Sequence, residues 1–358
     1  MGAMGKYIYG IIDNGDAETF PLDGVVQFDA DTDETPDCEQ AYTISWRDIS
    51  AVVTDAPIVD YTALPKDSLA RLLVRHQQVI EKVMARHAIL PLRLGTCAGS
   101  DEQVRCILDR GYRTIKDTLQ KARDLVEVDV TATISDFGAF LLRISQVAEI
   151  QQVTQSLLRM QQGVTTEAQM KVGLLVKQHA DREKQQMSQQ IQAMLNDLAE
   201  DSRAHDLMDD RMVLNSAFLI RKDLQEDFDD QVRRLNSHFG DSLDFRCVGP
   251  LPPYSFHTLE VRVAHFEEVD WARRQLGLSE DFITADAIKK AHRRVALTCH
   301  PDKHPDMPDI EKKFHDMSRA YKILLDCCRA SSQTEHEEGF HFNELTCEKN
   351  AILVTTLG

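Results

Sequence analysis

The pattern of the chain changes near residue 267, and this change limits the folds it can adopt. Before that position strand-like and helix-like segments are mixed, whereas from there to about residue 330 the pattern is wholly helical. A single hydrophobic core rarely extends over a chain of 358 residues. We therefore predict an α+β part followed by a separate all-α module.

The charge distribution marks the same boundary. The formal net charge is −17, yet residues 280–330 hold ten Lys or Arg against nine Asp or Glu. An acidic chain is repelled by a phosphate backbone, so we expect no nucleic-acid partner. The chain has no apolar run of the length a membrane helix needs, so we expect no membrane partner. The eight cysteines form no CxxC pair, which indicates free thiols in a reducing cytoplasm.

Residues 5–125 are predicted to form a first α+β unit. Its strand-like and helix-like segments have the order expected for helices on one face of an antiparallel sheet. The expected strands are Lys6–Asp13, Tyr42–Trp46, Ile49–Thr54 and Leu90–Thr96, and the expected helices are Lys66–Arg86 and Asp101–Leu125.

Residues 126–265 are predicted to form a second α+β unit. Its middle, about 148–203, is Gln-rich and helical, and such a helix projects from the body or packs as a hairpin. The three prolines of Gly249–Phe256 argue against regular structure there. The expected strands are Val126–Ile134, Phe137–Ile144, Arg211–Ile220 and Leu243–Val248, with a helix at Leu224–Phe239 that Gly240 caps.

Residues 266–330 are predicted to form the all-α module, and residues 331–358 a C-terminal tail. The tail ends in a strand-like run, Ala351–Leu357, whose partner the sequence does not identify. The expected helices of the module are Val269–Leu278, Thr284–Leu297 with Thr284 as N-cap, and Ile310–Leu325.

The loop between the last two helices carries the main candidate site. It starts His300-Pro301-Asp302, where the proline ring fixes its own φ and favours an extended His300. On the preceding helix, basic residues recur at spacings of three and four and so gather on neighbouring turns. These residues are Lys289, Lys290, Arg293 and Arg294.

This ordered set of residues resembles a J domain, that is, a DnaJ-like domain. The matching residues are Ala287-Ile288-Lys289-Lys290-Ala291, Arg293-Arg294, Ala296-Leu297, Cys299-His300-Pro301-Asp302-Lys303, Lys313-Phe314, Met317 and Ala320-Tyr321-Lys322-Ile323-Leu324. The resemblance implies that the basic face and the loop bind a DnaK-type chaperone and stimulate its ATP hydrolysis. Phe282–Asp286 is an irregular lead into the second helix, and nothing after Leu325 resembles the usual fourth helix.

The first 260 residues resemble the GvpF/GvpL gas vesicle protein family. The residues that carry the resemblance are Tyr7-Ile8-Tyr9-Gly10-Ile11-Ile12, Leu90-Pro91-Leu92-Arg93-Leu94-Gly95-Thr96, Ala217-Phe218-Leu219-Ile220 with Phe228, Val232 and Leu235, and Gly249-Pro250-Leu251-Pro252-Pro253-Tyr254-Ser255-Phe256. The family implies two ferredoxin-like domains, here with a long helical insertion, and an assembly factor that contacts the vesicle shell protein and other accessory proteins. Its expected location is the cytoplasm, at the gas vesicle.

Several alternatives remain open. Cys299, His300, His304 and Asp306 are possible metal ligands, but they lack a second ligand cluster, so we expect neither a metal nor a cofactor. Arg93 fits a structural ion pair better than a ligand contact. No catalytic constellation is present, so we predict that the chain is not an enzyme, although a ferredoxin-like scaffold alone does not exclude one. The other alternative is a structural vesicle component whose J-like segment only docks proteins.

Overall fold

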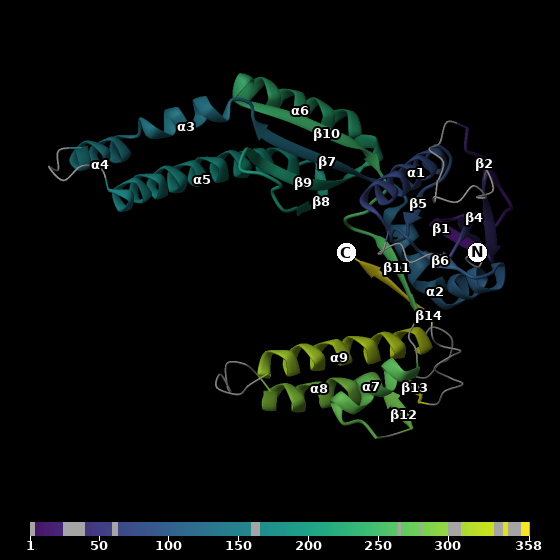
Figure 1. The fold of residues 1–358 in the computed structure, drawn as a ribbon. Helices are drawn as coiled ribbons and strands as arrows, with labels where there is room; N and C mark the ends of the chain where they lie inside the picture. Colours follow the sequence, from purple (N-terminus) through teal and green to yellow (C-terminus); the bar gives the residue numbers. More distant parts are fainter. Residues whose placement is uncertain are drawn as a thin grey trace. The chain divides into compact units, whose positions relative to one another are not determined.

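The chain, drawn in Figure 1, divides into two compact units. One is formed by residues 1–123 together with 256–358, and the other by residues 124–255. The computed structural model describes residues 4–23, 40–58, 64–158, 165–263, 266–279, 281–299, 309–332, 339–342 and 352–357.

An antiparallel sheet in the order β2-β3-β4-β1-β5 forms the centre of the first unit. β1 pairs with β4 from Met4↔Pro57 to Ile12↔Ser50, with a register shift between Ile8 and Gly10. β6 pairs with the start of β1. The strands are β1 (Met4–Ile12), β2 (Thr19–Pro21), β3 (Gln40–Trp46), β4 (Ile49–Pro57), β5 (Ile89–Pro91) and β6 (Cys97–Ala98).

Helices cover both faces of this sheet. Tyr7 and Tyr9 face His76 of α1 (Lys66–Met84), whereas Ile8 shares a core with residues of α2 (Asp101–Ala122). The expectation of helices on one face was therefore wrong. The reason is visible in β1, since a strand that is apolar at every position from Tyr7 to Ile12 needs a covering layer on each side.

The expected strand Leu90–Thr96 ends early. β5 stops at Pro91, and a turn follows in which the Thr96 amide donates to the Arg93 carbonyl at 3.2 Å. Gly95 has a φ of 86°, a left-handed conformation that glycine adopts without steric cost. The turn is tied to the sheet, because the Ile8 amide donates to the Thr96 carbonyl at 2.9 Å.

The second unit has one antiparallel sheet in the order β10-β7-β9-β8. With its helices this is a βαββαβ chain in the ferredoxin-like strand order, whereas the N-terminal sheet follows a different order. The α+β class is confirmed for both. The elements are β7 (Leu125–Ile134), α3 (Phe137–Ser145), α4 (Ala148–Leu158), α5 (Thr166–Asn196), β8 (Ala199–Ala204), β9 (Met212–Arg221), α6 (Gln225–Phe239) and β10 (Leu243–Leu251).

Three expectations in this unit were wrong. The helical middle, expected to reach about residue 203, ends at Asn196, and Ala199–Ala204 form the strand β8. Residues 137–144 form α3 instead of a strand, because the Asp136 carboxylate caps the Ala139 amide at 2.8 Å and Phe140 and Ile144 are buried one turn apart. β10 also continues through Gly249-Pro250 to Leu251. A register shift after Val248 gives the proline a place in the strand where the ladder is interrupted.

The C-terminal module packs three helices around one core. The predicted N-cap is confirmed, since the Ala287 amide donates to Thr284 Oγ1 at 3.1 Å. A short antiparallel strand pair accompanies the helices. The segment Phe282–Thr284, which precedes the second helix, is therefore a strand, and the module is not purely α-helical. The elements are α7 (Phe266–Leu276), β12 (Phe282–Thr284), α8 (Ala285–Cys299), α9 (Ile310–Ser332) and β13 (Gly339–His341).

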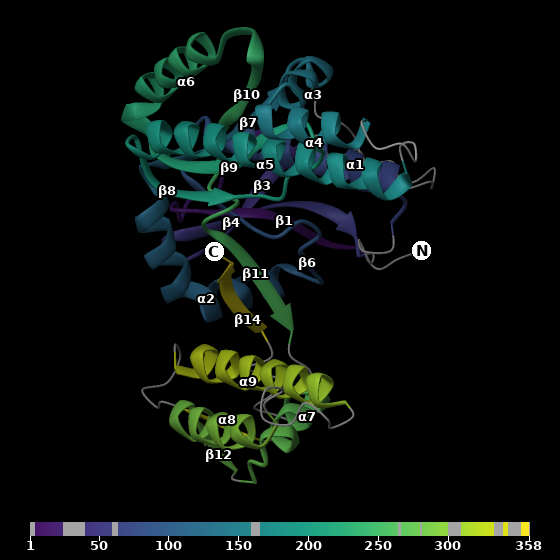
Figure 2. The ribbon, with the colours of Figure 1, turned by 90° about the vertical axis from the view of Figure 1, so that its left-hand side faces the viewer.

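The strand-like run near the C-terminus has a partner. β14 (Ile352–Leu357) pairs antiparallel with β11 (Thr258–Val263), a strand that sequence reasoning missed (Figure 2). Two 3₁₀ turns, Lys222–Leu224 and Gly240–Ser242, complete the described elements.

Candidate functional site

The outward face of α8 is the first candidate site. Ile288 and Ala291 are buried in the core of the module, which turns Lys289, Lys290 and Arg293 towards solvent. In the described part of the chain none of these three cations has an ion pair or side-chain hydrogen bond. They form a basic face available to an acidic partner.

Arg294 differs from the other three cations. Its guanidinium donates to the carbonyl of Leu276 at 3.2 Å, at the end of α7, where Gly277 has a φ of 63°. A cation near the C-terminus of a helix interacts favourably with the partial negative charge there. Arg294 is thus engaged inside the module. The basic face that sequence spacing predicted therefore splits into one structural cation and three that have no partner among the described residues.

Leu297 continues this face towards the end of α8. Its side chain is 63% exposed and lies one turn beyond Arg293. The sequence indicated that Leu297 lies on this face, since position 297 follows 290, 293 and 294 at helical spacing. His300, Pro301 and Asp302 follow directly in the chain but lie outside the described residues.

α9 holds α8 in place. The rings of His292 on α8 and Tyr321 on α9 have centroids 4.2 Å apart, and burial lowers the pKa of His292. Below them, Met317, Ala320 and Leu324 pack into the shared core. The basic face therefore sits on a rigid two-helix support.

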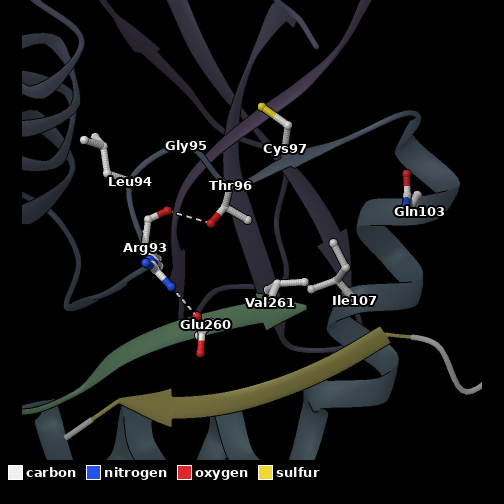
Figure 3. Close-up of a pocket in the computed structure, with 9 residues that line it drawn as sticks. All are labelled: Arg93, Leu94, Gly95, Thr96, Cys97, Gln103, Ile107, Glu260 and Val261. Atoms are coloured by element: carbon white, nitrogen blue, oxygen red, sulfur yellow. Dashed lines mark hydrogen bonds and ion pairs between the residues drawn. The ribbon is translucent and has the colours of Figure 1, made fainter. Parts of the chain in front are cut away.

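A pocket of about 310 Å³ in the first unit is the second candidate (Figure 3). Arg93 and Glu260 form an ion pair across it, and Thr96 Oγ1 donates to the Arg93 carbonyl at 2.6 Å. The apolar side chains of Val261 and Ile107 lie at its other end (Figure 3). Because the charged pair neutralises itself, the pocket offers no uncompensated charge to a ligand.

The proline-rich segment of the second unit is fastened to β7. The Ser255 amide and hydroxyl donate to the Glu127 carboxylate at 2.7 and 2.8 Å. Burial raises the pKa of Glu127 to about 7, and burial also raises the pKa of neighbouring Asp129, an effect that the nearby His205 opposes. Sequence reasoning noted the segment but not its carboxylate anchor.

A buried polar network lies between β1 and α1. The Tyr7 hydroxyl and His76 Nδ1 are 2.9 Å apart, and Arg75 Nε donates to the Tyr9 hydroxyl at 3.3 Å. Burial lowers the pKa of His76 to about 4, so its imidazole is neutral near pH 7.

The described residues offer neither a metal-binding cluster nor a membrane-spanning helix. No group of three or more His, Cys, Asp or Glu side chains there is arranged to hold a metal ion. No described helix is long and apolar enough to cross a membrane. Of the possible metal ligands at positions 299–306, all but Cys299 lie outside the described residues.

Comparison with known proteins identifies two regions. The model of the gas vesicle synthesis protein GvpL/GvpF family matches residues 5–258, and that of the DnaJ domain matches residues 274–331. Gas vesicle protein F of Haloferax mediterranei is 22% identical over 258 residues, which is 71% of this chain and 94% of that protein. Protein CAJ1 of Saccharomyces cerevisiae is 54% identical over 43 residues, 12% of this chain and 11% of that protein.

Solved structures show the same fold. The crystal structure of the gas vesicle protein GvpF from Anabaena matches with a TM-score of 0.56 at 23% identity, covering 70% of this chain and 97% of that one. The GvpF structure from Microcystis aeruginosa matches with a TM-score of 0.52 at 24% identity, covering 70% and 98%.

Proposed function

The chain belongs to the gas vesicle synthesis protein GvpL/GvpF family, and we propose that it is a non-enzymatic assembly factor that recruits a DnaK-type chaperone to vesicle shell subunits. The observation that carries the proposal is that one chain holds both a family-matching part and a DnaJ-domain match, whose exposed basic face has no partner among the described residues. Its proposed location is the cytoplasm, at the gas vesicle.

The physical rationale concerns the client. A shell subunit that polymerises into a water-excluding wall is apolar and prone to aggregate before it assembles. A protein that holds this subunit and calls a chaperone to the same place would keep it soluble until assembly. ATP hydrolysis belongs to the chaperone in this scheme, and the proposed contacts are His300, Pro301, Asp302 and the α8 face of Lys289, Lys290 and Arg293. Arg294 would support that face from within.

The first experiment measures the steady-state ATPase rate of the cognate DnaK-type chaperone with the full chain added. We expect stimulation by the wild type, loss of stimulation by His300→Gln, and a weakened, salt-sensitive effect with Lys290→Glu or Arg293→Glu. Lys322→Glu is the matched control, because Lys322 is an exposed cation on α9 of the same module. If Lys290→Glu and Arg293→Glu stimulate the chaperone as strongly as Lys322→Glu does, the α8 face is removed from the proposal.

A second candidate is a structural vesicle component whose J-like module only docks proteins. The departure after the third helix favours it, since α9 runs on to Ser332 and the described residues contain no fourth helix of the module. Co-purification distinguishes the two. A chain that stays with washed vesicles and never stimulates the chaperone is structural, whereas one that binds unassembled shell subunit and stimulates the chaperone is an assembly factor.

A further inference from the structure

The helical module is inserted between two paired strands. β11 precedes the module and β14 follows it, and the two form an unbroken antiparallel ladder from Thr258↔Leu357 to Val263↔Ile352. α7 begins three residues after Val263. The module is thus joined to the rest of the first unit at both ends, once by the chain that leaves β11 and once by the pairing of β14.

β14 occupies a groove between β11 and α2. Val354 is only 7% exposed and shares a core with Ile115 of α2 and Leu259 of β11. Gly111 of α2 makes room for it, because a Cβ at that position would lie 2.8 Å from Val354 Cγ1. The groove therefore has Gly111 at its base and the edge of β11 as its hydrogen-bonding partner. These are the features that an added strand requires.

The walls of the groove define what it can hold. Ile107, Ile115, Leu259 and Val261 are apolar, and the nearby Arg93 and Glu260 neutralise each other. A charged segment would lose hydration here without gaining a partner. An extended, uncharged segment with a β-branched residue at the Val354 position fits both the ladder and the floor.

We propose that this groove is a strand-binding site for an extended apolar segment of the client, and that β14 is its built-in occupant. This step rests on the proposed function, which supplies an apolar client. When a client segment takes the place of β14, the helical module loses its second attachment. It is then held only by the chain that leaves β11 and can move further towards the chaperone. Binding of the client is thereby coupled to presentation of the module.

Tethering makes the site selective. A strand that stays covalently tethered to the protein has an effective concentration on the order of millimolar at its own groove, so a free peptide competes poorly with it. A second copy of the chain offers the same strand with no gain in contacts and an added cost of association. A client that is held elsewhere on the protein as well avoids this handicap, which is why we assign the site to the client.

The test uses the full chain and a fluorescent synthetic peptide with the sequence of residues 351–358. In Val354→Asp the built-in strand is weakened, so we expect the peptide to bind at least about 100-fold more tightly than to the wild type. Thr356→Asp is the matched control, because it places the same charge at an exposed position of the same strand. A peptide with Asp at the Val354 position should bind neither variant.

Equal, weak binding of the peptide to wild type and to a folded Val354→Asp chain would overturn the proposal. If Val354→Asp fails to fold, a full chain with a protease site within residues 343–350 replaces it. After cleavage β14 should remain bound and exchange with added peptide, and a strand that never exchanges would also overturn the proposal. A dimer formed by Val354→Asp mixed with wild type would assign the site to a second copy instead.

These measurements need neither chaperone nor shell subunit, so their failure is distinguishable from failure of the proposed function. A final experiment adds shell subunit to the wild-type protein and to Val354→Asp. Tighter retention by Val354→Asp supports the client assignment, and unchanged retention overturns it.

Discussion

β1 and β7 are both inner strands of antiparallel sheets, yet their surroundings differ. β1 is buried at every position from Tyr7 to Ile12, with α1 on one face and α2 on the other. β7 alternates, with Val126, Val128 and Val130 in the core and polar side chains between them. A continuous apolar run indicates a strand covered on both sides, and alternation indicates one covered on a single side.

The two strands also bury ionisable groups of opposite type. The Tyr7 and Tyr9 rings pack against His76, a base kept neutral by burial, whereas β7 carries Glu127, an acid whose pKa burial raises. Burial disfavours the charged form in each case. The two regions should therefore respond to pH in opposite directions.

The largest expected effect tests whether β1 is covered on more faces than β7. Ile8→Ala removes a side chain that is 1% exposed, so unfolding should become easier by roughly 2–5 kcal/mol. Thr131→Ala, on the polar face of β7, should change stability by about 0.5 kcal/mol or less. Urea denaturation of the full chain measures both. Similar losses at the two positions would mean that β1 is not the better-covered strand.

The second prediction concerns His76. Its folded pKa of about 4 lies below the unfolded value of 6.5, so stability present above pH 6.5 is lost as pH falls towards 4. The loss should reach about 3 kcal/mol at 1.36 kcal/mol per unit. Thermal melts between pH 4 and 7 should show this slope in the wild type and a flatter one in His76→Gln. The exposed His238→Gln should keep the wild-type slope.

The third prediction has the opposite sign. The folded pKa of Glu127, about 7, lies above the unfolded value of 4.5, so stability present below pH 4.5 is lost as pH rises through 7. The loss should be at most about 3 kcal/mol, and smaller in practice because Asp129 responds to the same proton. Hydrogen exchange at the Ser255 amide reports it locally. Glu127→Gln should remove the pH dependence, and exposed Asp244→Asn should not.

The smallest effect compares two helical glycines. At Gly111 a methyl group would lie 2.8 Å from Ile115 Cδ1 and Val354 Cγ1, whereas nothing lies within 4 Å of the Cβ position at Gly173. Gly173→Ala should stabilise the chain by up to about 1 kcal/mol through helix propensity. Gly111→Ala should lose that gain to crowding and come out destabilising by about 1 kcal/mol. Differential scanning calorimetry of both variants decides, and a stabilising Gly111→Ala would contradict the tight seat of β14.

Much of the local structure was predictable. The helix at Lys66–Met84, the Thr284 cap and the helix pair of the J-like module follow from periodicity and capping chemistry. Residues 137–144 misled because their apolar residues suit a strand as well as a short helix, and only the Asp136 cap decides between them. For the candidate site, spacing placed the four cations on one helix but could not show that Arg294 turns to the end of α7.

The sequence by itself determined the two family resemblances and the residues that repeat on one helical face, because these depend on neighbours within a few positions. The tertiary structure decided which distant segments meet. Helices on both faces of the first sheet, Glu127 under Ser255, and β14 returning across the helical module to β11 all join residues tens of positions apart or more. Such contacts depend on how buried surfaces fit together, and local pattern carries no record of that fit.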